Sequence, residues 1–418
     1  MATAGDVLMP RSALDDPVTL VRRGWITYWT AALFGMYAAY YAAAQILLPK
    51  QAEAIVGDAG KITLLALATG VAAVVTIVVT FLAGVYSDRT LAGRGRRQVW
   101  VLAGAVVTGI GFLGQGLMTS AIGMIGVWSL ANVGISCMTA ALFAAVPDEV
   151  PVNQRAFVSS FYGIAVAAGP LIGIALVTLV VLDILPGFTL LGLLAVLLAL
   201  PFCLGTRSVP LRREQRPPLS SGAILKGVLA PLRHADFALA WSGRFFIQLS
   251  NALAQVFLFF YLQDFLDYPD PEGGTFLLVA IYTLAVVVVT VPAGRISDRS
   301  LKRKRMVVIS SVLQGASGLV FAFVPAFPAT MIGAAILGVG YGVYASVDQA
   351  LITQVLPHPE DRGKDLGVIN IANVLPYALT GLIGGIVINS FGYPTLMVLV
   401  AVTGAIAALT VQPIRSVR

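Results

Sequence analysis

Two stretches of sequence decide the fold of this 418-residue chain: residues 84–97, GVYSDRTLAGRGRR, and residues 294–305, GRISDRSLKRKR. They begin 210 positions apart, and each ends one long apolar run and precedes another. Both contain Ser-Asp-Arg after a glycine and continue into basic residues. A further pair of loop arginines, Arg155 and Arg362, lies 207 positions apart. The spacing indicates two halves with the same organisation.

The composition places these halves in a membrane. Hydrophobic residues make up 58% of the chain and Asp, Glu, Lys and Arg together 11%, whereas soluble domains carry roughly 25% charged residues. This excludes an ordinary soluble enzyme, a disordered chain and a secreted disulfide scaffold. The formal net charge of +7 does not indicate nucleic-acid binding, because so little of the chain can form a soluble basic face. Cys137 and Cys203 lie in apolar segments without metal or redox spacing.

The sequence contains twelve apolar runs that are long enough to cross a bilayer. About 20 apolar residues are needed for each span, and helices are expected because backbone groups in lipid must be satisfied internally. The predicted spans are 25–48, 61–87, 98–119, 122–146, 156–181, 185–205, 236–264, 275–297, 306–325, 329–356, 366–390 and 393–413. We therefore predict an all-α membrane protein of two pseudo-symmetric six-helix halves, 25–205 and 236–413. Residues 1–24 and 414–418 would be the termini, and 206–235 the linker.

The distribution of basic residues predicts the orientation. Of the 27 Lys and Arg, 24 fall in the termini and in alternate loops on one side. Lys50 and Lys61 fall on the other side, with Asp264, Asp267, Asp270 and Glu272, while Arg244 lies inside a span. Because cytoplasmic loops carry the excess of Lys and Arg, both termini and the linker are expected in the cytoplasm.

The two quoted stretches resemble the cytoplasmic loop signature of the major facilitator superfamily, and the resemblance covers nearly the whole chain. It implies transport by alternating access and a cytoplasmic gate that latches in the outward-facing state. In that latch the motif Asp meets a helix N-terminus of the other half, where a carboxylate is stabilised. The implied gate residues are Gly84, Asp88, Arg89, Arg96, Arg97, Arg155, Gly294, Asp298, Arg299 and Arg362. The alternative is that these charges only set the topology.

A narrower resemblance points to a substrate class. Residues 347–376, from VDQALITQVLP to INIANVLP, and residues 243–249, GRFFIQL, are similar to the sucrose-transporter-like proton–sugar symporters. This resemblance implies proton-coupled uptake of a sugar or glycoside.

Two ionisable residues lie deep inside spans, Arg244 and Asp348. Each is about eight residues from the cytoplasmic end of its span, or roughly 12 Å at 1.5 Å per residue. Their matched depth suggests that they pair. Such groups are costly in a membrane and are functional candidates. The pair is either a static brace within the second half or a coupling site at which Asp348 exchanges a proton.

Uncharged polar residues recur at helical spacing along five spans, so each set occupies one helix face. We expect the following to bind substrate: Tyr37, Tyr41, Gln45, Asn132, Gln248, Asn251, Gln255, Tyr341, Tyr344 and Asn373. Ser136, Thr139, Asn370 and Tyr377 extend the same faces. Aromatic rings alternating with amides suit a hydroxylated solute. The alternative is interhelical hydrogen bonding, worth about 0.6 kcal/mol per contact.

These observations predict a secondary active transporter of the inner or plasma membrane, with a small-molecule substrate and a proton or another cation as partners. We expect a monomer in the lipid bilayer, without nucleic acid, cofactor, metal or catalytic residues. A proton-coupled drug or metabolite efflux antiporter is the first alternative. A non-transporting receptor or scaffold is the second, although a scaffold would need neither duplicated gate motifs nor polar stripes.

Overall fold

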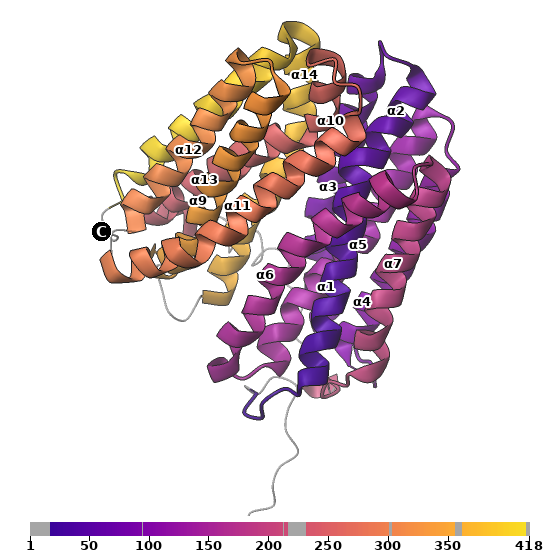
Figure 1. The fold of residues 1–418 in the computed structure, drawn as a ribbon. Coiled ribbons are helices and arrows are strands. Elements are labelled where there is room, and N and C mark those ends of the chain that lie inside the picture. The colour runs from indigo at the N-terminus through magenta and orange to yellow at the C-terminus, as the bar shows by residue number, and fades with distance from the viewer. Residues whose placement is uncertain are drawn as a thin grey trace, which may run out of the picture.

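The structure is a computed structural model that describes residues 17–93, 95–211, 213–215, 231–300, 303–355 and 362–414. Every regular element in these residues is a helix. Most of the predicted linker 206–235 and of the two predicted termini lies outside the described residues. The remaining chain forms two groups of helices that follow each other in sequence (Figure 1).

The first group contains α1 to α7. Its helices are α1 (Arg23–Ala42), α2 (Leu48–Val56), α3 (Lys61–Asp88), α4 (Arg96–Gly116), α5 (Ala121–Glu149), α6 (Val152–Ala175) and α7 (Ile184–Gly205). Two π-helical turns lie within it, η1 (Ala43–Leu47) between α1 and α2 and η2 (Leu176–Val180) after α6. A short 3-10 turn, η3 (Arg213–Gln215), follows α7.

The second group contains α9 to α14. Its helices are α9 (Ala235–Val256), α10 (Leu258–Phe260), α11 (Pro271–Ser300), α12 (Arg303–Phe323), α13 (Phe327–Val355) and α14 (Arg362–Val411). The 3-10 turn η4 (Pro231–Arg233) precedes α9, and the π-helical turn η5 (Tyr261–Phe265) follows α10.

The described residues contain ten helical stretches long and apolar enough to cross a membrane. An eleventh forms if α9 is taken with the segment Leu258–Phe265, from which it is bent by 46°. One of the ten, Ile371–Val411, is 41 residues long and contains Gly392 at φ 80° and ψ 174°. The non-helical backbone at Gly392 separates the two spans predicted there, so the arrangement accommodates the predicted twelve.

The first span is longer than predicted. Its expected end at residue 48 rested on Pro49 and Lys50, but the helix continues to Val56. Pro49 lies in the first turn of α2, directly after the π-helical turn Ala43–Leu47. A proline is tolerated in a first turn because its missing N–H is not needed there. The π-helical turn thus lets the helix pass through a residue that would otherwise end it.

Alternating helix directions gather opposite charges at the two ends of the bundle. We call the end with Asp58, Asp264, Asp267, Asp270 and Glu272 the acidic end. The end with Arg22, Arg23, Arg96, Arg97 and Arg299 is the basic end. The two groups of helices converge at the acidic end, uppermost in Figure 1, and diverge toward the basic end.

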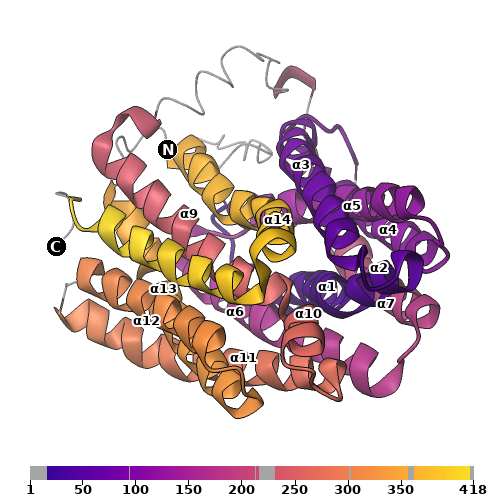
Figure 2. The same cartoon turned by 90° about the horizontal axis from the view of Figure 1, so that it is seen from above.

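Helices α3 and α14 make the most extensive helix pairing between the two halves, side by side in the view from above (Figure 2). Gly381 and Gly385 of α14 face Thr69 and Ala66 of α3, so closely that an added Cβ on either glycine would clash. These positions all belong to the parts of α3 and α14 nearer the acidic end. Glycine at such a crossing lets the two backbones approach.

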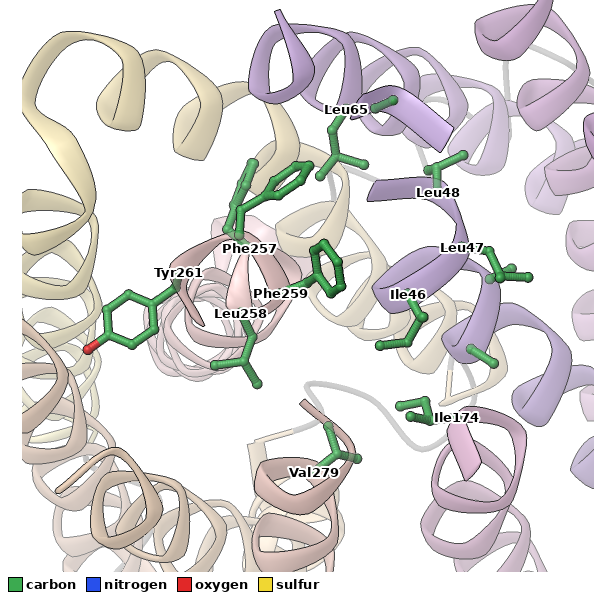
Figure 3. Packing of buried hydrophobic residues seen from close by; sticks show 14 of the residues in the cluster. Ile46, Leu47, Leu48, Leu65, Ile174, Phe257, Leu258, Phe259, Tyr261 and Val279 are labelled. Carbon is green, nitrogen blue, oxygen red and sulfur yellow. The ribbon is translucent and has the colours of Figure 1, made fainter. Parts of the chain in front are cut away.

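A single apolar cluster joins the halves near the acidic end (Figure 3). Ile46, Leu65 and Ile174 come from the first half, and Phe257, Leu258 and Val279 from the second. Each is at most 6% exposed. Lipid chains are as apolar as these residues, so the contact stabilises the bundle through close packing. The halves are therefore packed together at one end.

We expect Gly392→Ala to destabilise the protein by about 1–3 kcal/mol, because φ 80° with ψ 174° is a region that only glycine adopts readily. Thermal unfolding of purified protein in detergent measures the loss. Gly126→Ala is the matched control, since a Cβ there meets nothing within 4 Å. Equal melting temperatures for the two variants would contradict the prediction.

Candidate functional site

Arg244 of α9 and Asp348 of α13, expected to pair, lie with Arg244 Nη2 at 3.1 Å from Asp348 Oδ2. Their side chains are 8% and 11% exposed. Arg244 also donates from Nε to Asn373 Oδ1 of α14 at 2.6 Å. Asn373 accepts a further, longer bond of 3.5 Å from Gln248 Nε2. Three helices of the second half are thus joined around one buried charge pair.

A second hydrogen-bonded group lies further along α9, around Asn251. Asn251 Nδ2 donates to the Tyr282 hydroxyl at 3.1 Å, and Gln255 Nε2 donates to Asn251 Oδ1 at 2.5 Å. The Tyr377 hydroxyl donates to the same Oδ1 at 3.4 Å. The predicted polar face of α9 therefore binds α11 and α14 in this state, as well as facing the space between the halves.

Aromatic rings pack against one another in each half. In the first half, the Tyr37 ring stacks on that of Tyr41 and meets that of Tyr162 edge-on, each with centroids 6.1 Å apart. In the second half, the Tyr341 ring lies 6.1 Å from that of Tyr282 and 5.9 Å from that of Tyr344. Rings and amides together offer stacking surfaces and hydrogen-bonding groups.

A cavity of about 80 Å³ lies between the two halves. Predicted site residues in its wall are Tyr41, Gln45, Asn132 and Gln255, and Tyr377, which extends the polar face of its span, lies there too. Gln45 belongs to the π-helical turn Ala43–Leu47 and is 6% exposed. Its Oε1 accepts no hydrogen bond from any residue that the structure describes. π-Helical turns inside helices are frequent at functional sites, and a buried acceptor without a partner costs about 1–3 kcal/mol. Gln45, a residue of the cavity wall, therefore has a buried acceptor without a described partner.

The structure adds lining residues that the sequence reasoning did not select. These are Tyr40, Ala44, Thr69, Ala72, Ala73, Thr76, Trp128 and Val256. Thr69 and Thr76 are seven residues apart on α3, and Thr76 donates to Asn132 Oδ1 at 3.4 Å. That i, i+7 spacing was a detectable signal. The sequence contains no comparable signal for Trp128, because a tryptophan in an apolar span can equally belong to the hydrophobic core.

The first copy of the repeated stretch forms an ion cluster within its own half. Arg97 donates to Asp148 Oδ2 at 2.7 Å and to Asp88 Oδ1 at 2.5 Å. Arg96 binds the same Asp148 oxygen at 2.9 Å from Nη2. Asp88, 52% exposed, thus pairs with the first turn of α4 in its own half. Its expected contact with the other half stays a prediction.

The other expected gate residues are distributed around the basic end. Arg155 donates to the carbonyls of Val150 and Pro147, which closes the end of α5. Arg89 directly follows α3, Arg299 is exposed in the last turn of α11, and Gly84 and Gly294 lie inside those two helices. A Cβ on Gly84 would meet nothing within 4 Å, so close packing does not explain that glycine. The side chains of Asp298 and Arg362 lie outside the described part of the structure.

Breaking the buried charge pair should be costly. We expect Asp348→Asn to destabilise the protein by about 3–5 kcal/mol, because Arg244 then stays buried without its counterion. The double variant Arg244→Met with Asp348→Leu should recover most of this loss, since neither charge remains. Tryptophan fluorescence during thermal unfolding in detergent compares the variants. An Asp348→Asn protein as stable as the unmodified chain would contradict the expectation.

The family model of the Major Facilitator Superfamily matches residues 32–280 and 240–416. No curated protein sequence matches the chain.

Among the solved structures that share the fold are three crystal structures of transporters. A single-residue mutant of the nucleoside transporter NupG has a TM-score of 0.74 and 13% identity, and covers 93% of this chain and 99% of its own. A POT family transporter in complex with 5-aminolevulinic acid has a TM-score of 0.72 and 14% identity, and the match covers 93% of this chain and 95% of the transporter. The peptide transporter POT in complex with sulfate has a TM-score of 0.71 and 12% identity, and the match covers 96% of this chain and 95% of the transporter. With the family match over most of its length, the chain belongs to the Major Facilitator Superfamily and is a multi-pass membrane transporter rather than an enzyme.

Proposed function

We propose that this transporter moves a small, uncharged, hydrogen-bonding organic solute, a sugar or glycoside, in symport with protons by alternating access. The observation that carries the proposal is the cavity between the halves, with its tyrosines, amides and the unpartnered acceptor of Gln45. A hydroxylated ring supplies both the donors that such an acceptor lacks and a face that stacks on tyrosine.

The charge pattern favours a neutral solute. Arg244 and Asp348 compensate each other at 3.1 Å, so neither is free to hold a charged substrate in this state. The groups in the cavity wall itself are hydroxyls, amides and apolar side chains. The nucleoside transporter NupG shares the fold, and a nucleoside is also a hydroxylated, uncharged solute. Nucleosides therefore belong in the substrate panel.

We infer that the basic end faces the cytoplasm, because cytoplasmic loops collect Lys and Arg. The halves then contact each other on the outer side and diverge on the cytoplasmic side (Figure 1). This corresponds to a state closed to the outside, in which the outward-facing latch of Asp88 is not engaged. The pairing of Asp88 with Arg97 of α4, in the same half, supports this assignment.

Asp348 is the proposed coupling group of the second half. When it is ionised, it compensates Arg244. When it is protonated, Arg244 keeps Asn373 as a neutral partner but loses its counterion. The protonation state of Asp348 thus changes the electrostatic balance beside the predicted substrate residues Gln248 and Tyr344. A static brace would tolerate neutralisation of both partners, whereas a coupling site would not.

Purified protein in liposomes tests the function. The expected result is a rise in the external pH when a sugar or glycoside is added. The solute should also accumulate when a pH gradient is imposed. Extrusion of dyes driven by the gradient, without any sugar response, would instead identify an efflux antiporter. Absence of any flux across sugars, nucleosides and dyes would favour a receptor or scaffold. The double variant Arg244→Met with Asp348→Leu should abolish gradient-driven accumulation.

Gln45→Leu should weaken solute affinity by about tenfold, the equivalent of one hydrogen bond, without loss of stability, since its Oε1 has no described partner to lose. Gln314→Leu is the matched control. Gln314 is fully buried on α12, its amide oxygen and nitrogen likewise have no partner among the described residues, and it does not line the cavity. Uptake kinetics and melting temperature measure the two effects. Equal affinity losses in both variants would contradict a binding role for Gln45.

A further inference from the structure

A pocket of about 600 Å³ opens at the basic end of the protein. One of its walls is formed by residues 19–22 with the first turns of α1, and another by the end of α7 with residues 206–209. Arg96 of α4 and the last two residues of α5 complete the lining. All of these residues belong to the first half or to the start of the predicted linker, so the pocket is separate from the cavity between the halves. We call it the basic-end pocket, and its volume is that of a typical ligand site.

Hydrogen bonds fix the two chain segments that form these walls. The backbone N–H of Val21 donates to Gln154 Oε1 at 2.8 Å, and Gln154 Nε2 donates to the Val21 carbonyl at 3.2 Å. On the other wall, Gln98 Nε2 donates to Thr206 Oγ1 at 3.1 Å, and Ser208 Oγ donates to Gln98 Oε1 at 3.0 Å. The basic-end pocket is therefore preformed, which lowers the entropy cost of filling it.

The two acids in the lining are already bound by groups of the protein. Asp148 Oδ2 lies 2.9 Å from Arg96 Nη2 and 2.7 Å from Arg97 Nε. Arg97 also pairs with Asp88, so the charges of these two arginines and two aspartates cancel. Glu149 accepts hydrogen bonds from three side chains, those of Trp25, Gln98 and Ser208. Neither carboxylate is available to a further base without giving up these contacts.

Two arginines of the lining have no such partner. Arg22 is the N-cap residue of α1, and Arg207 lies two residues beyond the end of α7. Both are exposed, and neither makes an ion pair with any residue that the structure describes. Their two positive charges meet one carboxylate that no base compensates, that of Glu149. The lining is therefore short of one negative charge, which an anionic ligand would supply.

The pocket lies at the level of a membrane surface. Trp25 and Tyr28 occupy the first turns of the first span, and such residues concentrate where a bilayer meets water. The Tyr28 ring packs on Gly205, where an added Cβ would lie 2.7 Å from it. Leu20 in the lining and Leu204 in the last turn of α7 are exposed apolar side chains. Apolar side chains beside uncompensated arginines suit a ligand that carries both a charge and acyl chains.

We propose that the basic-end pocket binds the head group of an anionic phospholipid, with Arg22 and Arg207 holding its phosphate. Guanidinium groups form paired, charge-assisted hydrogen bonds with phosphate oxygens, and basic pockets between membrane helices bind such head groups. The phosphate supplies the negative charge that the lining lacks. A bound lipid connects the start of the first span to the segment that leads into the linker. The site goes beyond transport and does not depend on which solute the protein carries.

Purified full-length protein in detergent tests the site, with phosphatidylglycerol as the anionic probe and phosphatidylcholine as the zwitterionic one. Native mass spectrometry should detect retained phosphatidylglycerol, and this lipid should raise the melting temperature more than phosphatidylcholine does. Equal stabilisation by phosphatidylcholine would contradict the charge argument. Equal stabilisation by inorganic phosphate would show that a soluble anion occupies the pocket, which would overturn the assignment to a lipid.

Arg22→Gln with Arg207→Gln should weaken phosphatidylglycerol binding about thirtyfold. The melting temperature without lipid should not change, because both side chains are exposed and make no described ion pair. The control is Arg295→Gln with Arg305→Gln, which removes the same charge from exposed positions at the basic end of the second half. The control should keep the binding. Equal losses in the two double variants would indicate general attraction to anionic lipid and would overturn the site.

Gly24→Glu provides a test that leaves both arginines in place. Gly24 lines the pocket in the first turn of α1, and an added Cβ meets only Tyr28 Cε2, at 3.9 Å. A carboxylate there supplies the missing charge from the protein and stabilises the helix N-terminus. We therefore expect loss of phosphatidylglycerol binding without a fall in the melting temperature of the lipid-free protein. Gly24→Gln, of equal size but neutral, should keep the binding, and retained binding in Gly24→Glu would refute the proposal.

Discussion

The architecture depends on one constraint, which is that a charge within or beside hydrocarbon must have a compensating partner. The chain meets it differently at three depths. Arg96 and Arg97 share Asp148 at the basic end, Arg244 meets Asp348 between spans, and Lys61 meets Asp264 at the acidic end. The first two clusters lie inside one half each, whereas the third connects the halves. Charges within a half make that half rigid, and charges between halves form a separable joint.

The joint and the cavity are adjacent along the same helices. The first span carries Gln45 at the cavity and Glu53 at the joint. The seventh span carries Gln255 at the cavity and Asp264 at the joint. The apolar residues Ile46, Phe257 and Leu258 pack between these two levels (Figure 3). A movement that separates Glu53 from Gln263 must therefore rearrange the apolar layer above the cavity. We therefore expect binding and opening to be coupled mechanically, through the first span and through the seventh, which is bent by 46° between Gln255 and Asp264.

The sequence predicted the spans and the pairing partners of the deepest charges well, because hydropathy and spacing record burial directly. It placed Arg244 and Asp348 at one depth, and the structure has them 3.1 Å apart. It could not pair Lys61 with Asp264, which are 203 positions apart and each looked like a loop charge. It also missed Trp128, Tyr162 and Tyr282, since an aromatic residue in an apolar span shows no polar signal. Contacts between distant helices are decided by packing, which a single sequence does not display.

The unexpected length of the first helical stretch has a further consequence. Its 34 residues, Arg23–Val56, measure about 51 Å as a helix, well beyond the roughly 30 Å of a bilayer core. The last turns of α2 therefore project past the hydrocarbon, and Lys50 and Glu53 with them. Mobile ions at that level screen the ion pair of Lys50 with Glu272, whereas the more buried pair Arg244–Asp348 is screened much less. Raising the ionic strength should therefore weaken the charge contacts at the acidic end more than the buried pair.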